Sequence, residues 1–397
     1  MIRTLLFSLL LFSAFCLPAQ EDFKVVGYLP YYRFGFNDQI NFEQLTHLNI
    51  AFANPLMNGQ LEVGGQNIAP VVSIARGHGL TVLISMGGGL TAEWRQAWRT
   101  LMEPPNRTGF IHTIMEFVRT YELDGVDMDL EGGDVTELYS PFVLELRDSL
   151  SAEGKLLTAA LPGLTRDADI TDEALAAFDW VNMMVYNLTG PWAPNSPGPH
   201  SPYSFAVSSI NNWLSQGVPP DKLTLGIPFY GWDFSNTPVT SFTYRTIVEQ
   251  DPANAYTDQA GQAYYNGIFT VQNKTVLAME LISGVMIWEI GQDSYTEYSL
   301  LNAIHETIYP PTSAGEEPLA DALSVYPNPF SEELSVQNQA GHPLQLRLAA
   351  LDGRILQQFT VGAYSNYWLN TASLAPGMYV LQMVGQEYPQ VYKVLRY

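Results

Sequence analysis

Residues 123–131 read Leu123-Asp124-Gly125-Val126-Asp127-Met128-Asp129-Leu130-Glu131. Asp127, Asp129 and Glu131 stand at every second position, with apolar residues between them. Successive side chains of an extended strand point to opposite faces, so the three carboxyls share one face, roughly 7 Å apart along the strand. Such a face is costly unless it lines a functional cavity. The pattern therefore predicts a strand whose acidic side faces a site.

Two other interpretations of this stretch are a solvated amphipathic edge strand and a cation site. Calcium loops also alternate acidic residues, but on a looped backbone with a glycine inside the ligand run. Here the interior positions are Val126, Met128 and Leu130, which are typical of a strand. Gly132-Gly133 follow Glu131, and their bare backbone leaves room for a ligand. The sequence favours a carboxylate active site.

The composition of the 397-residue chain limits its partners and its compartment. A formal net charge of −22 argues against nucleic acid and anionic membrane surfaces as partners. Residues 1–19 are typical of a secretory signal, with a basic Arg3, a short apolar run and a cleavage site at Leu17-Pro18-Ala19. Cys16, the only cysteine, falls inside that segment, so we expect no disulfide in the mature chain. No later segment is long and apolar enough to span a membrane.

Apolar runs then alternate with helical patterns, which predicts an α/β fold with a parallel sheet. Eight strands are expected, at Lys24–Leu29, Leu45–Ala53, Leu80–Met86, Leu123–Leu130, Leu156–Leu161, Trp180–Tyr186, Leu223–Phe229 and Gly284–Trp288. The clearest helices are Arg107–Tyr121, with a start marked by Pro104-Pro105, and Glu297–Ile308, since each shows the spacing of one buried face. Eight strands with intervening helices predict a (β/α)8 TIM barrel, whose sites lie at the C-terminal strand ends.

Aromatic residues gather near these strand ends. They are Tyr28, Phe52, Tyr186, Tyr230 and Trp288. Aromatic rings around carboxylates suggest stacking on sugar rings, while packing of the barrel explains any single one about equally well. The six histidines are scattered without ligand spacing, so we expect no metal site.

Five motifs resemble those of glycoside hydrolase family 18, the chitinase family. The acidic strand matches the signature Asp-Gly-x-Asp-x-Asp-x-Glu. The other four are Ser85-x-Gly87-Gly88, Met184-x-Tyr186-Asn187, Gly226-x-Pro228-Phe229-Tyr230-Gly231 and the last-strand Trp288. They stand in the family's order between about Lys24 and Ile308. The resemblance implies a TIM barrel that hydrolyses glycosidic bonds.

Family membership would imply substrate-assisted catalysis, without a second carboxylate as nucleophile. Glu131 would protonate the glycosidic oxygen, Asp129 would hold the acetamido N–H, and Asp127 would hydrogen-bond Asp129. Tyr186 would donate to the acetamido carbonyl, and Trp288 would form the floor of that subsite. Crowded carboxyls raise one another's pKa, which suits a general acid. The full set of expected substrate-binding residues is Tyr28, Phe52, Met184, Asn187, Trp192, Tyr230 and Trp288.

The chain departs from the family pattern at three motif positions. One is Leu130, where an aromatic is common before the catalytic Glu, and this departure should affect packing rather than chemistry. Asn187 stands where the family has an Asp after the tyrosine, which removes a negative charge near Glu131 and predicts a shifted pH optimum. Gly89-Leu90 stand where an aromatic is common, which leaves Trp94 or Trp192 for stacking beyond the cleavage point.

The connection before the last strand is short. About fifty residues separate Tyr230 from Gly284. Family members with deep, exo-acting clefts insert a small α+β domain there, so we expect that domain to be absent here. The resemblance then implies an open groove and cutting inside chains.

The C-terminal segment changes character after a proline-containing linker that begins at Tyr309-Pro310-Pro311. Short strands and turns without helices predict a small β-sandwich. Three of its motifs resemble the type IX secretion sorting domain: Val325-Tyr326-Pro327-Asn328-Pro329-Phe330, Leu374-x-Pro376-Gly377-Met378-Tyr379 and Lys393-Val394-Leu395. A carbohydrate-binding module is the alternative. The sorting role implies recognition by the type IX secretion machinery, passage across the outer membrane and removal of the segment.

Together these features predict a signal peptide at 1–19, a barrel at 20–310, a linker at 311–321 and a sorting domain at 322–397. The expected function is a chitinase that cuts β-1,4 bonds between N-acetylglucosamine units with retention and without a cofactor. Its partners would be chitin or chitooligosaccharides, and its location extracellular or cell-surface attached. An endo-β-N-acetylglucosaminidase acting on N-glycans is the nearest alternative. A chitin-binding lectin is disfavoured because such relatives usually lose the acid that Glu131 supplies.

Overall fold

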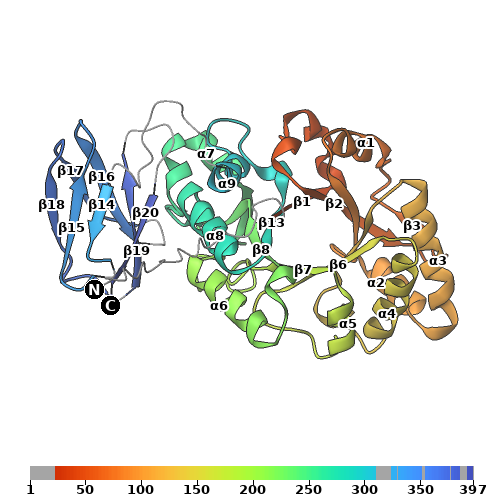
Figure 1. Ribbon diagram of the computed structural model, residues 1–397. Helices are drawn as coiled ribbons and strands as arrows, with labels where there is room; N and C mark the ends of the chain where they lie inside the picture. The colour runs from red at the N-terminus through yellow and green to blue at the C-terminus, as the bar shows by residue number, and fades with distance from the viewer. Residues whose placement is uncertain are drawn as a thin grey trace, which may run out of the picture.

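The computed structural model describes residues 23–309, 323–328, 330–350, 354–375, 377–384 and 391–396. The expected signal peptide, the expected linker at 311–321 and the turn at Asp352-Gly353 lie outside the described residues. Figure 1 shows a ring of strands surrounded by helices, followed along the chain by a body made of strands alone. The predicted fold, a TIM barrel followed by an all-β C-terminal part, is confirmed.

Eight parallel strands form the barrel. They are β1 (Lys24–Pro30), β2 (His47–Pro55), β4 (Thr81–Met86), β5 (Gly125–Met128), β6 (Leu156–Pro162), β7 (Trp180–Met184), β8 (Leu223–Pro228) and β13 (Gly284–Trp288). Hydrogen-bonded neighbours follow the order β1-β13-β8-β7-β6-β5-β4-β2, and β2 pairs back with β1, so the sheet closes on itself. A short β3 (Leu61–Glu62) pairs antiparallel with the end of β2.

The acidic strand is shorter than expected. β5 ends at Met128, which pairs with Met86, the last residue of β4. On the β4 side the ladder therefore ends there, and the Asp129 N–H donates to the Met86 carbonyl at 2.7 Å. Asp129 and Glu131 therefore leave the sheet at the mouth of the barrel. The expected strand Trp180–Tyr186 ends two residues early, at Met184.

Helices cover the outside of the ring (Figure 1). They are α1 (Ala69–Gly77), α2 (Ala92–Leu101), α3 (Pro104–Thr120), α4 (Tyr139–Ser151), α5 (Asp172–Ala177), α6 (Tyr203–Ser215), α8 (Ile268–Leu281) and α9 (Leu300–Ile308). The expected start of α3 at the proline pair is confirmed, since proline suits the first helical turn. The expected start of α9 at Glu297 is wrong: Ser299 caps the helix by accepting from the Asn302 N–H, which fixes its first turn.

The connection between β8 and β13 contains more structure than expected. Four short strands, β9 (Tyr230–Asp233), β10 (Thr240–Thr243), β11 (Gln259–Ala260) and β12 (Ala263–Tyr264), form an antiparallel sheet next to α7 (Tyr244–Gln250). The expectation that this connection carries no α+β unit is therefore wrong. Strands of two to four residues are too short for an alternating pattern to reveal them.

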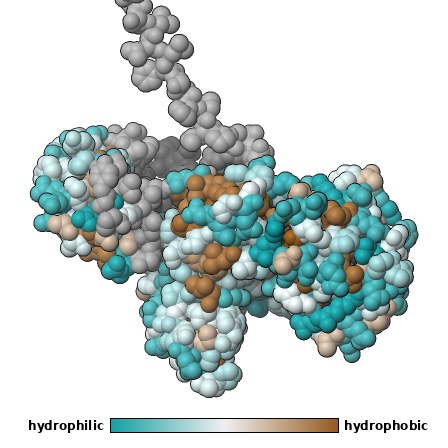
Figure 2. All heavy atoms as spheres, turned by 90° about the horizontal axis from the view of Figure 1, so that it is seen from below, coloured by the Kyte–Doolittle hydropathy of each residue, from teal (hydrophilic) through white to brown (hydrophobic). Residues whose placement is uncertain are grey.

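The apolar residues divide into two layers around the barrel. The larger core lies between strands and helices, and Val126, Met128 and Leu130 face it. A small cluster lies inside the mouth, where Tyr28 and Met286 contact the partly exposed Trp288. The face drawn in Figure 2 is mostly hydrophilic, with apolar atoms gathered in separate patches. None of the described helices combines the length and apolar character that a membrane crossing requires.

Two antiparallel sheets share one core in the C-terminal part. One contains β14 (Leu323–Tyr326), β15 (Glu333–Asn338) and β18 (Asn366–Asn370); the other contains β16 (Leu344–Ala350), β17 (Ile355–Val361), β19 (Gly377–Met383) and β20 (Val391–Arg396). The arrangement agrees with the predicted small β-sandwich.

Candidate active site

The acidic residues form a gradient of burial from the barrel interior to solvent. Asp127 is fully buried on β5, Asp129 is 5% exposed, and Glu131 is exposed. The apolar residues between them face the opposite side, as the alternation predicted. Three carboxyls thus run from the barrel floor toward the surface.

Asp127 is held by four donors from four strands. Tyr28 Oη and Ser85 Oγ each donate to its Oδ2 at 2.7 Å. Thr158 Oγ1 and Asn182 Nδ2 donate to its Oδ1 at 2.6 Å and 3.1 Å. Burial raises the pKa of Asp127, and these four hydrogen bonds oppose the rise by favouring the charged form.

The Asn182 amide is itself fixed in orientation. Its Oδ1 accepts from Trp180 Nε1 at 3.1 Å and from Thr224 Oγ1 at 2.8 Å. Two donors on this atom identify it as the oxygen, so Nδ2 must face Asp127. The base of the site is therefore a rigid polar network inside the barrel.

Asp129 differs from Asp127 although it is also buried. Its Oδ1 is a buried oxygen without a hydrogen-bond partner among the described residues. Burial raises its pKa well above the usual range, and the charges of Glu131 and Asp127 raise it further. Burial among protein atoms also raises the pKa of Glu131, although part of the residue is exposed to solvent. At least one proton is therefore retained between Asp129 and Glu131 well above the pH at which a free carboxyl loses it.

A cleft of about 250 Å³ opens above these carboxyls. It is lined by Tyr31, Tyr32, Phe52, Asn54, Gly88, Gly89, Trp94, Asp129, Glu131, Met184, Tyr186, Asn187 and Trp288. The Phe52 ring stacks on Trp288 with centroids 5.5 Å apart. Burial raises the pKa of Tyr186 well above its usual range, so its hydroxyl remains a donor. The cleft thus joins apolar ring faces to carboxyls and one phenol.

Asn187 has a fixed amide at one wall of the cleft. Its Oδ1 accepts from Tyr230 Oη at 2.6 Å and Trp232 Nε1 at 3.1 Å, so its Nδ2 is the group left to face other partners. Its φ of 63° is a conformation that Asn tolerates better than most residues. Because the amide is neutral, it adds no charge beside Glu131.

Buried groups behind this wall hold the loop that carries Asn187. His200 Nδ1 accepts from the Asn187 N–H at 3.4 Å, so its Nε2 carries the proton donated to the Tyr230 carbonyl at 3.2 Å. Burial lowers the pKa of His200 to about 3, which keeps the ring neutral. Next to it, Lys274 Nζ donates to the Ser201 carbonyl and hydroxyl, each at 2.7 Å.

The expected site residues occupy three kinds of position. Phe52, Met184, Tyr186, Asn187 and Trp288 line the cleft with the two outer carboxyls. Tyr28 and Tyr230 are buried and support side chains of the site through their hydroxyls. Trp192 is 57% exposed, contacts Trp232 edge to face at 5.8 Å, and does not line the described cleft.

Three supporting residues were missed from the sequence: Thr158, Asn182 and Thr224, for which no role was expected. Each is a polar side chain inside an otherwise apolar strand. That exception was the available signal, because a buried polar group needs a partner.

A second cavity, of about 190 Å³, lies away from the acidic residues, next to the start of α9. Asp293 belongs to its lining and accepts from the Leu300 and Leu301 N–H groups and from Ser299 Oγ. Burial raises the pKa of Asp293 to about 6. Its carboxylate serves the helix N-terminus and is structural. The described residues contain no cluster of His, Cys, Asp and Glu arranged to hold a metal ion.

Two family models match the chain. Glycosyl hydrolases family 18 matches residues 24–293, and the secretion system C-terminal sorting domain matches residues 324–395. The crystal structure of the family 18 chitinase ChiB from the chitin utilization locus of Flavobacterium johnsoniae is 45% identical, with a TM-score of 0.71. The match covers 72% of this chain and 94% of that one.

More distant relatives agree with this match. A chitinase structure from Bacteroides thetaiotaomicron is 26% identical, with a TM-score of 0.64 over 74% of this chain and 98% of that chain. A chitinase-like effector of Moniliophthora roreri is 29% identical over 50% of this chain and 55% of its own length. The chain therefore spans about half the length of that curated relative.

Proposed function

The chain belongs to family 18 of the glycosyl hydrolases, and we propose that it is a secreted chitinase that cleaves β-1,4 bonds between N-acetylglucosamine units with retention. The single observation that carries this proposal is the unpaired, buried Oδ1 of Asp129. A buried acceptor without a donor destabilises the folded protein. Its presence in the site therefore supports a hydrogen bond to a donor that arrives with the substrate. The acetamido N–H of N-acetylglucosamine is a donor of the required kind.

The first chemical step uses Glu131 as the acid. Glu131 gives its proton to the glycosidic oxygen while the bond from that oxygen to C1 breaks. The acetamido carbonyl oxygen of the same sugar forms the new bond to C1, which gives an oxazolinium ring and the free leaving sugar. The raised pKa of Glu131 supports this role because a general acid must hold its proton near the working pH.

Neighbouring groups would stabilise the ring as it forms. Asp129 would accept the acetamido N–H and balance the positive charge, with Asp127 fixed beneath it. Tyr186 would donate its hydroxyl to the acetamido carbonyl oxygen, and Trp288 would supply the apolar floor. Fixed donors and charges of this kind stabilise a transition state without reorganisation. Water then attacks C1 while the bond from C1 to the acetamido oxygen breaks, and the water gives a proton to Glu131. This step restores the acid, the acetamido group and the β configuration.

We further propose that the cleft acts inside chains. The prediction from an absent α+β unit no longer supports this, because a small unit is present next to α7. Support comes instead from the number of aromatic rings that line the cleft, among them Tyr31, Tyr32 and Trp94, which suit several sugar units.

The sorting-domain match supports secretion by way of the C-terminal part. We propose that this part is recognised by the type IX secretion machinery and removed, and that the barrel acts outside the cell or on its surface. Comparing the mass of the cell-associated and released protein with that of the full chain tests this. A released chain that keeps residues 324–395 would contradict removal.

The experiment that tests the activity is mass spectrometry of products from the full chain, incubated with chitohexaose and a high-mannose glycoprotein in one mixture. Dimers to tetramers from the hexamer, reduced about 10³-fold in rate by Glu131→Gln, are the expected result. Glu137→Gln, which changes an exposed glutamate in the same loop region, is the matched control and should leave the rate unchanged.

Two outcomes would replace the proposal. Released glycans with intact hexamer would favour an endo-β-N-acetylglucosaminidase. Binding of the hexamer without any product would favour a lectin. Proton NMR of the first products checks retention: the β anomer should appear before mutarotation, and an initial α anomer would contradict the mechanism.

A further inference from the structure

The acid stands on a part of the chain that the barrel sheet does not hold. Gly132 and Gly133 follow Glu131 directly, and Gly132 has a φ of 53°. A Cβ added to either glycine would meet nothing within 4 Å in the described part of the chain, so this side of the turn has no close packing. Glycine also has more backbone freedom than any other residue. The position of the Glu131 carboxyl must therefore be fixed from elsewhere.

Asp134 ends the exposed turn that begins at the acid. Gly132–Asp134 form a single 3-10 turn, in which the Asp134 N–H donates to the Glu131 carbonyl at 3.1 Å. Glu131 and the two glycines are exposed, whereas Leu130 before them and Asp134 after them are buried. The acid therefore lies on a short arch, residues 131–133, with one buried residue at each end. Leu130 fixes the first end by packing in the core, which leaves the second end to Asp134.

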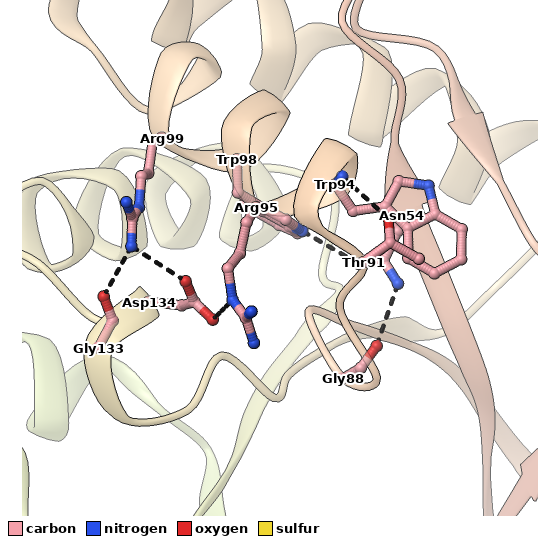
Figure 3. A network of polar contacts seen from close by, with 9 residues as sticks. All are labelled: Asn54, Gly88, Thr91, Trp94, Arg95, Trp98, Arg99, Gly133 and Asp134. Atoms are coloured by element: carbon pink, nitrogen blue, oxygen red, sulfur yellow. Dashed lines mark hydrogen bonds and ion pairs between the residues drawn. The ribbon is translucent and has the colours of Figure 1, made fainter.

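Two arginines of α2 hold the Asp134 carboxylate (Figure 3). Arg95 Nε donates to its Oδ2 at 2.6 Å, and Arg99 Nη2 donates to its Oδ1 at 3.4 Å. Arg99 Nη2 also donates to the Gly133 carbonyl, inside the arch, at 3.3 Å. The two arginines are four residues apart, so they lie on one row of the helix. Together with Asp134 they form a clamp on the arch.

The helix that carries the arginines is itself fixed to the barrel. Trp98, which precedes Arg99, is buried, and its Nε1 donates to Asn54 Oδ1 at 3.0 Å (Figure 3). Asn54 belongs to β2, and its Nδ2 donates to the Gly88 carbonyl at 3.1 Å (Figure 3). The clamp therefore links the arch to the barrel through α2 and β2.

The clamp differs from an ordinary ion pair at the surface. An exposed pair contributes little because both charges stay in water. Here the Asp134 side chain is only 10% exposed, although both arginines are about half exposed. The N–H of the same residue also bonds to the carbonyl of the acid. A change in the clamp is therefore passed to the backbone of Glu131 by a single residue.

Resting on the proposed function, we infer that this clamp positions the Glu131 carboxyl at the glycosidic oxygen. Asp134, Arg95 and Arg99 do not line the described cleft, so they are positioning residues that act through the acid. Proton transfer requires the acid within hydrogen-bond distance of the leaving oxygen, and a misplacement of about 1 Å can lower a rate roughly 10²-fold. Asp129 precedes the arch, so stabilisation of the oxazolinium ring should not depend on the clamp.

Two substrates separate the position of the acid from the rest of the chemistry. The leaving sugar of chitohexaose needs a proton, whereas β-chitobiosyl fluoride expels fluoride ion, which leaves with little help from an acid. For both, kcat/KM reports the steps up to cleavage of the first bond, so the later action of Glu131 as a base does not enter. Asp134→Ala should lower kcat/KM for the hexamer about tenfold, mainly through kcat, and change that for the fluoride by less than about twofold.

Arg95→Met tests the clamp from α2 without changing the arch itself. It should lower kcat/KM for the hexamer severalfold and add nothing in an Asp134→Ala background, because both changes remove the same contact. Arg119→Met, on α3, is the matched control: it removes a half-exposed arginine that pairs with Glu153 and should leave both substrates unchanged. An unchanged rate on the fluoride also shows that each variant is folded.

The clamp and the proposed function fail in different ways. If the unmodified chain does not hydrolyse chitohexaose, the proposed function fails. If it does, an unchanged hexamer rate in Asp134→Ala, an equal loss on both substrates, or an additive loss in the double variant would each overturn the clamp. A loss that is confined to the hexamer and shared by the two variants supports it.

Discussion

Asp127 and Asp129 are two residues apart, carry the same carboxyl and are both buried, yet their surroundings are opposite. Asp127 accepts four hydrogen bonds from four strands, while Asp129 keeps an oxygen without a partner. Burial alone therefore does not distinguish a structural carboxyl from a chemical one. The number of protein donors that already bond to the carboxyl distinguishes the two, because a fully hydrogen-bonded carboxyl has no free acceptor for a substrate.

The largest effect is expected from Asp129→Asn. An amide has the same shape but only one oxygen and no charge, so it stabilises the positive charge of the oxazolinium ring poorly. We expect kcat/KM for chitohexaose to fall about 10²- to 10³-fold, measured by product release at neutral pH. A loss of less than fivefold would contradict this, since Asp129 would then take no direct part in the reaction and would only support the site, as Asp127 does.

The same variant should be more stable than the parent at neutral pH. Because the folded-state pKa of Asp129 is raised, the folded protein binds more protons than the unfolded chain, and its free energy of unfolding falls as pH rises from the ordinary carboxyl range through the raised pKa. Asparagine removes that penalty. Urea unfolding should show an advantage for the variant at pH 7.5 that narrows as the pH falls toward 4.

The next effect is expected from Asp127→Ala, and it is on stability. The change leaves four buried donors without an acceptor, so the free energy of unfolding should fall by about 3 to 5 kcal/mol. Asp148→Ala, at an exposed carboxylate on α4, is the control and should stay within about 0.5 kcal/mol. If Asp127→Ala loses activity but keeps the parent's stability, the assignment of Asp127 to the supporting network is wrong.

The smallest effect is expected from Asn187→Asp, and it appears in the pH profile. The new carboxylate can still accept from Tyr230 and Trp232, so the wall should keep its shape. Its negative charge should raise the pKa of Glu131, which moves the basic limb of kcat/KM to higher pH by roughly half a unit to one unit. Gln216→Glu adds the same charge on an exposed residue away from the cleft. An unchanged profile, or a shift toward acid, would contradict the prediction.

The sequence predicted the barrel strands and the acidic strand because both follow from local patterns of apolar and polar residues. Strands β1, β4 and β13 were placed within a residue of their observed bounds, since apolar runs and their flanking turns are local signals. The alternation of Asp127, Asp129 and Glu131 was also local. Tyr186 and Trp288 were expected beside these carboxyls from motifs, and they line the same cleft.

Contacts between distant segments could not be predicted in the same way. Thr158 lies 31 residues from Asp127, and Arg95 lies 39 residues from Asp134, so each pair meets only once neighbouring strands of the barrel have paired. The start of α9 was missed because Ser299 outweighs the helical pattern upstream of it. The small sheet next to α7 was missed because its strands are too short to show a period.

The closure of the barrel has a consequence for how the chain is made. β1 begins at Lys24, and one of its two neighbours is β13, which ends at Trp288. The first strand cannot complete its hydrogen bonds until more than 250 further residues have left the ribosome, so the nascent chain stays open for most of its synthesis. At about 5 to 20 residues per second, that delay lasts on the order of ten seconds or longer. Chaperones and export factors would meet an unfolded polypeptide during that interval.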